Sequence, residues 1–145
     1  MKLFSIGFTQ TSAEHFFSRL KRAGVERVID VRLHNVSQLA GFAKKDDLRY
    51  FLDAIGGIAY EHRPELAPTA DLLERYRKRN QRGSWEAYAT GFRELMRERA
   101  IEGLPRAGFA GACLLCSEHS AQQCHRRLVA DYLSAKWGGL DVSHL

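Results

Sequence analysis

The sequence predicts a single α/β domain over residues 1–145, a three-layer sandwich with a mostly parallel sheet of about five strands and helices on both faces. Short apolar runs alternate along the chain with amphipathic helical patterns, and turn residues separate them. Hydrophobic residues make up 45% and charged residues 27% of the chain, an ordinary globular balance. A chain of this length can bury one sizeable core.

The first half predicts three strands and two helices. The apolar runs 3–8, 25–32 and 58–62 are expected strands, the second rich in β-branched residues. Apolar residues at helical spacing predict helices over 11–24 and about 48–55. Thr11 and Glu14 have the spacing of a capping box, and Gly24 suits the end of the first helix.

The second half predicts a helix pair, a strand, a helix and a final strand. Helical patterns cover about 70–80 and 85–101, and Tyr88 and Phe92 lie on an apolar stripe of the second, which is more typical of core than of a cofactor site. Strands are expected at 111–117 and 140–145, with a helix over 123–139 between them.

Composition favours a cytoplasmic protein with anionic partners. No apolar run approaches the ~18 residues of a membrane-spanning helix, and the first ten residues do not form a secretory signal. Three cysteines do not make a disulfide framework. The net charge of +5, with five basic residues in 74–83, favours an anionic small molecule or nucleic acid. No membrane partner, cofactor or oligomeric state is predicted.

Polar residues follow the expected strands. In open parallel sheets, ligands bind beyond the carboxyl ends of the strands, so side chains at those ends are expected to converge. They are Thr9 after the first strand, Asp30, Arg32 and His34 after the second, His62 after the third, Cys116, Glu118 and His119 after the fourth, and Cys124, His125 and Arg126 at the start of the last helix.

Cys124 is the first candidate for a nucleophile, because a helix start and nearby cations both favour a thiolate. Cys116 is the second candidate, whereas Cys113 should point to the opposite sheet face as a core residue. His62 or His119 is the expected acid–base partner, with Glu118 beside them. His125 is a weaker choice, since adjacent helical residues point about 100° apart.

Arg32 and Arg126 are expected to clamp a phosphate or carboxylate, because guanidinium groups bind these anions with two hydrogen bonds. His125, Asp30 and Thr9 are further candidates for substrate binding. Asp30 has an alternative role, which is to pair with Arg32 inside the protein.

Several segments together resemble the Domain of Unknown Function 488 family: "SIGFT", "IDVR", "SQLAGFAKKDDL", "GIAYEHRPELAPT", "SWEAYATGF", "CLLCSE", "CHRRLVADYL" and "VSHL". They occur in the family's order over nearly the whole chain. The resemblance implies a single α/β domain of bacterial or archaeal type, without a settled activity. It also implies that the family's signature falls on Asp30, Arg32, His62, Cys116, Glu118, Cys124, His125 and Arg126.

Three functions remain open at this level. An enzyme would use the cysteine site on a nucleotide, a nucleic acid or another phosphorylated substrate. A non-catalytic module would bind nucleic acid through the basic surface. A metal site formed by Cys116, Cys124 and a histidine has weaker support, because the cysteines are eight residues apart and no second Cys-x-x-Cys lies on a turn. A redox pair of the same two cysteines is a further alternative.

Overall fold

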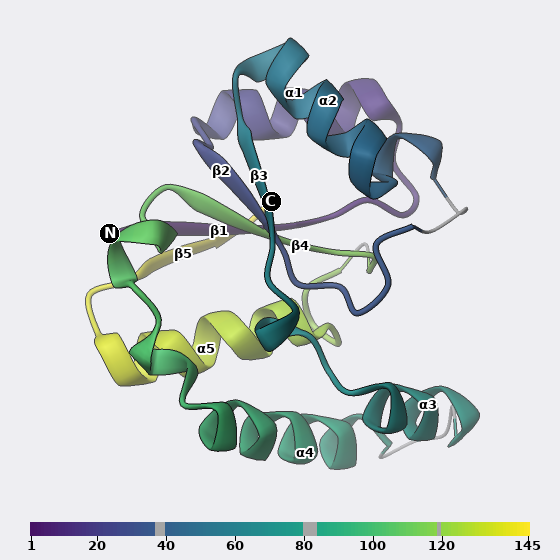
Figure 1. Cartoon of the computed structure of the whole chain (residues 1–145), viewed down its shortest axis with the longest axis vertical. Helices are drawn as coiled ribbons and strands as arrows, with labels where there is room; N and C mark the ends of the chain where they lie inside the picture. Colours follow the sequence, from purple (N-terminus) through teal and green to yellow (C-terminus); the bar gives the residue numbers. More distant parts are fainter. Residues whose placement is uncertain (37–39, 80–83, 119) are drawn as a thin grey trace.

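A five-stranded parallel sheet forms the centre of the protein, with strand order β3-β2-β4-β1-β5 (Figure 1). The computed structural model describes residues 1–36, 40–79, 84–118 and 120–145, with the backbone only for 78, 79 and 84. The strands are β1 (Lys2–Gly7), β2 (Arg27–Asp30), β3 (Ala59–His62), β4 (Ala112–Cys116) and β5 (Asp141–His144). The predicted fold class is confirmed.

Helices cover both faces of the sheet (Figure 1). Helices α1 (Ala13–Ala23) and α2 (Lys45–Gly56) pack on one face, and α5 (His125–Trp137) packs on the other. The predicted helix pair is α3 (Ala70–Arg79) and α4 (Ser84–Arg99), and α4 packs against α5. None of the helices in the described part of the chain is long and apolar enough to cross a membrane.

Strand β4 divides the core in two. All five of its residues are buried, as expected for a central parallel strand. Cys113 and Leu115 face the layer of α1 and α2, whereas Leu114 and Cys116 face the layer of α5. The predicted separation of Cys113 from Cys116 is therefore confirmed, and it follows from the two-residue period of a strand.

The cap of α1 differs from the prediction. Ser12 is the N-cap, and its hydroxyl accepts a hydrogen bond of 3.1 Å from the backbone N–H of His15. The predicted capping box of Thr11 and Glu14 is wrong, because the helix begins one residue later than that box requires. Gly24 ends the helix in the left-handed region, with φ of 74°, as predicted.

The strand order creates a crevice between two central strands. Strands β2 and β4 are neighbours, yet the chain leaves β2 towards α2 on one face and leaves β4 directly for α5 on the other. Such a reversal of direction opens a crevice beyond the carboxyl ends of the strands, where ligands of open α/β sheets bind. The residues after β2 and β4 are thus placed at the expected site.

Candidate active site

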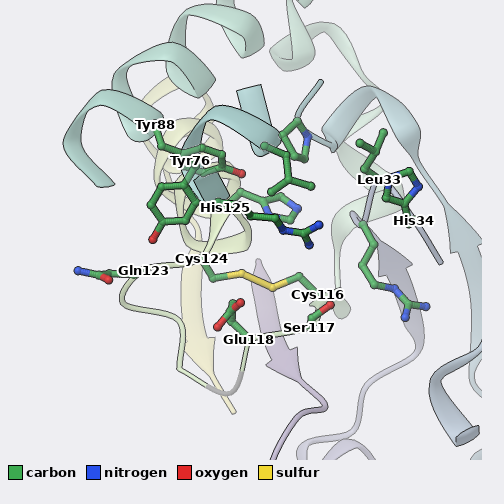
Figure 2. A pocket seen from close by; sticks show the side chains of 14 residues that line it. Leu33, His34, Tyr76, Tyr88, Cys116, Ser117, Glu118, Gln123, Cys124 and His125 are labelled. Atoms are coloured by element: carbon green, nitrogen blue, oxygen red, sulfur yellow. A yellow bond between two sulfur atoms is a disulfide. The ribbon is translucent and has the colours of Figure 1, made fainter. Parts of the chain in front are cut away.

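A pocket of about 100 Å³ lies at this crevice, and Figure 2 shows its lining. Its walls come from the segment after β2, from α3 and α4, and from the segment that joins β4 to α5. The lining residues are Arg32, Leu33, His34, Pro68, Leu73, Tyr76, Arg77, Tyr88, Cys116, Ser117, Glu118, Gln123, Cys124 and His125. The cavity has room for a few heavy atoms, well below the ~300 Å³ of a typical small-molecule site.

The sulfur atoms of Cys116 and Cys124 are joined in a disulfide at this pocket (Figure 2). Cys116 is the last residue of β4, and Cys124 is the N-cap of α5. Both residues are nearly buried, with 1% and 3% of their surface exposed. Their Cα atoms are 7.6 Å apart. The end of one central strand and the start of one helix therefore place the two sulfurs together.

His125 lies beside the two sulfurs because Cys124 is not helical. Cys124 has extended backbone angles, with φ of −132° and ψ of 141°, so the 100° offset of adjacent helical residues does not apply to this pair. One donor atom from each of Cys116, Cys124 and His125 lies within 4.8 Å of the others. The sequence argument against His125 as a neighbour of Cys124 is thus corrected.

The imidazole of His125 has a defined tautomer. Its Nε2 lies 2.6 Å from the carbonyl oxygen of Val31, which can only accept, so Nε2 carries the hydrogen and Nδ1 has the free lone pair. Burial, with a smaller effect from the charge of Arg126, lowers the pKa of His125 to about 4, although the hydrogen bond to Val31 opposes this shift. The ring is therefore neutral at pH 7.

Arg126 brings a buried positive charge to Cys116. Its Nε donates to the hydroxyl of Ser5 at 3.1 Å, and its Nη1 donates to Sγ of Cys116 at 3.3 Å and to the carbonyl oxygen of Glu118. Burial lowers the pKa of Arg126 to about 10, so the guanidinium remains charged at pH 7. A guanidinium at this distance stabilises negative charge on the sulfur.

Arg32 is paired inside the protein. Its Nε and Nη2 donate to the carboxylate of Asp30 at 2.9 and 2.8 Å, and Nη2 also donates to the carbonyl oxygen of Ala43. The hydroxyl of Tyr60 donates to the same carboxylate at 2.6 Å, and burial followed by this contact raises the pKa of Tyr60. Arg32 lines the pocket but Arg126 does not, so the two guanidiniums of the expected clamp do not face one cavity.

The other predicted residues fall on both sides of the pocket boundary. Glu118 lines the pocket, whereas His62 and Thr9 do not. Nε2 of His62 is 2.9 Å from the backbone carbonyl oxygen of Arg32, and the backbone N–H of Thr9 donates to the carbonyl oxygen of Ser117. His119 lies outside the described residues. Among the described histidines, His125 is the one whose ring nitrogen approaches both sulfurs.

Sequence reasoning missed several residues of the site. Tyr76, Arg77 and Tyr88 form a wall of the pocket, although Tyr88 belongs to a stripe that predicts core alone. Gly7 lets the backbone of Glu118 lie close to the end of β1, because a Cβ at Gly7 would collide with the carbonyl oxygen of Glu118 and lie 2.9 Å from Nη1 of Arg126. Ser5 could have been found as the polar residue inside an apolar strand.

Comparison with known proteins identifies a family and no closer relative. The family model described as "Domain of unknown function DUF488" matches residues 12–133, which include both cysteines of the disulfide and the segments after β2, β3 and β4. No curated protein and no solved structure matches the chain. Since the match covers most of the chain, this protein belongs to the DUF488 family of domains of unknown function.

Proposed function

We propose that the protein is a thiol–disulfide oxidoreductase that acts on small anionic disulfides. The observation that carries the proposal is the Cys116–Cys124 disulfide at the pocket beyond the carboxyl ends of β2 and β4. The guanidinium of Arg126 lies 3.3 Å from the Cys116 sulfur. Two cysteines that meet at a ligand-binding edge can store and release two electrons.

The chemistry needs only the two thiols and an external thiol. The Cys124 thiolate attacks one sulfur of the substrate disulfide, forms a mixed disulfide and expels the first product thiolate, which takes a proton from solvent. The Cys116 thiolate then attacks the Cys124 sulfur and expels the second product. The substrate gains two electrons and two protons, and two molecules of a small thiol return them to the protein and leave as a disulfide.

Each cysteine has a setting that supports its role. Cys124 lies at the N-terminus of α5, where the helix dipole favours a thiolate. Cys116 receives a hydrogen bond from the charged Arg126, which stabilises its thiolate before the second step. The Nε2 of His125 is engaged by Val31, so its Nδ1 has the lone pair that can accept a hydrogen bond from a nearby thiol.

The lining favours a negatively charged substrate. Arg77 and His34 line the same pocket as the disulfide, and Glu118 is the carboxylate of that lining. The whole chain carries a formal charge of +5, which attracts anions over a longer range. We also place the protein in the cytoplasm, where the disulfides that do occur are usually catalytic or redox-sensing.

The test measures turnover of two disulfides of opposite charge. Dithiodiglycolate and cystamine, two small disulfides of similar size, are supplied with dithiothreitol at several ratios, and the Cys116–Cys124 state is read by alkylation and intact mass spectrometry. We expect the pair to cycle, dithiodiglycolate to react faster than cystamine, and Cys113→Ser to behave as wild type because Cys113 is buried on the other face.

Two outcomes would overturn the proposal. One is a pair that keeps a single redox state across all dithiothreitol ratios. The other is a rate of disulfide reduction in Cys124→Ser and Cys116→Ser equal to that of wild type. Equal rates for the two disulfides, with cycling intact, would overturn the anionic preference.

A further inference from the structure

The cysteine pair and His125 also form a set of metal ligands. In the described part of the chain, Cys116, Cys124 and His125 are the group whose potential donor atoms, two Sγ and one ring nitrogen, lie within 4.8 Å of one another. Two thiolates and an imidazole are typical ligands of Zn²⁺, with Zn–S bonds of about 2.3 Å and Zn–N bonds of about 2.0 Å. A single ion could bind all three atoms after small movements of the side chains.

The histidine is prepared for a metal by its hydrogen bond. Ligating histidines usually donate their second ring N–H to a carbonyl or carboxylate, which fixes the ring and the tautomer. Here Nε2 of His125 donates to the Val31 carbonyl oxygen at 2.6 Å, and the ring makes a T-shaped contact with Phe92. Nδ1 then keeps the lone pair for the metal.

The backbone spacing of the cysteines fits a shared ion. Their Cα atoms are 7.6 Å apart, whereas disulfides usually hold Cα atoms about 4.4–6.8 Å apart. Two sulfurs on one tetrahedral zinc lie about 3.8 Å from each other, as the bond length of about 2.3 Å requires. Reduction would let the sulfurs of Cys116 and Cys124 separate to that distance without moving the strand and the helix apart.

Charge and coordination number indicate which kind of site this is. Two thiolates neutralise one divalent ion, and Arg126 donates to the Cys116 sulfur as an outer partner. Three protein ligands leave the fourth position of a tetrahedron for a small molecule, as in catalytic zinc sites. The pocket of about 100 Å³ beside the ligands provides space for it.

We propose that the reduced protein binds one Zn²⁺ ion through Cys116, Cys124 and His125, with its fourth position open to the pocket. The inference rests on the proposed function in one respect, since the pair must be reducible. Oxidation to the disulfide removes two of the three ligands and releases the ion, so the redox state of the pair controls metal binding.

The experiment titrates the full chain with metal in both redox states. Protein reduced with a phosphine and treated with chelator is titrated with Zn²⁺ against a chromogenic chelator, and with Co²⁺ to record thiolate-to-cobalt charge-transfer bands. We expect one equivalent to bind to the reduced protein and none to the oxidised protein. His125→Gln should weaken zinc binding at least about tenfold and alter the cobalt spectrum.

Cys113→Ser is the matched control, because this cysteine is buried on the opposite face of the sheet and should leave the titration unchanged. Uptake by the Cys116→Ser/Cys124→Ser double variant equal to that of wild type would show adventitious binding and overturn the inference. Absence of uptake by a reduced protein that still cycles would overturn the metal site alone. Zinc uptake by a protein that never forms the disulfide would support the metal site and overturn the redox function.

Discussion

Replacing Asp30 by Asn should destabilise the protein strongly, because it leaves a buried guanidinium without its counter-ion. Asp30 is fully buried and Arg32 is 3% exposed. The carboxylate accepts hydrogen bonds from the backbone N–H, Nε and Nη2 of Arg32 and from the hydroxyl of Tyr60. Removing one partner of such a pair costs about 3–5 kcal/mol, which corresponds to a fall in Tm of roughly 6–20 °C for a domain of this size.

Urea and thermal unfolding would measure the effect, with Tyr60→Phe as the matched control. That control removes one hydrogen bond and keeps the ion pair, so we expect a loss of about 1–2 kcal/mol. The double variant Asp30→Asn/Arg32→Met removes both charges and should recover part of the lost stability. A loss below about 1 kcal/mol in Asp30→Asn, or a double variant less stable than the sum of its singles, would refute the reasoning.

Two further predictions concern His125 and Gly7. The pKa of His125 is about 4 in the folded protein, below its ordinary value of about 6.5. As the pH falls from 6.5 to 4, His125 therefore binds a proton in the unfolded chain before it does so in the folded chain. In metal-free protein the free energy of unfolding should fall by up to ~3 kcal/mol as the pH falls from 6.5 to 4. Urea titrations at each pH would measure this dependence, and His125→Gln should lose this part of it. An unchanged pH dependence in the variant would contradict its assignment to His125. Gly7→Ala should cost about 1–3 kcal/mol in urea unfolding through the clash with the Glu118 carbonyl, whereas Gly103→Ala, where a Cβ meets nothing within 4 Å, should stay within ~1 kcal/mol of wild type; equal effects at both positions would contradict the close approach.

Much of the fold could be predicted because the three central strands, β1, β2 and β4, are buried on both faces. Such strands read as continuous apolar runs, and the expected segments contain all five observed strands to within one residue. The strand order could not be predicted, since it depends on contacts between distant segments. The capping box failed for a local reason, because Ser12 and Thr11 compete for the same role and only the helix start decides between them.

The sequence predicted where the candidate site lies in the fold, but it did not predict the contacts within the site. The rule for strand ends brought Cys116, Glu118 and Cys124 to one pocket. The position of His125 depends on the extended backbone of Cys124, which residue types do not reveal. The burial of Arg126 was equally hidden, because an arginine in the first turn of a helix usually faces solvent.

The guanidinium of Arg126 ties the cysteine chemistry to the framework of the sheet. It contacts a sulfur, a hydroxyl of a central strand and a carbonyl of the neighbouring loop at once. A gain or loss of charge on that sulfur is expected to alter the hydrogen bonds of Arg126 to Ser5 and Glu118, because the buried guanidinium has little solvent around it to screen the change. A change in the redox state of the Cys116–Cys124 pair would thus shift the positions of β1 and of the loop after β4.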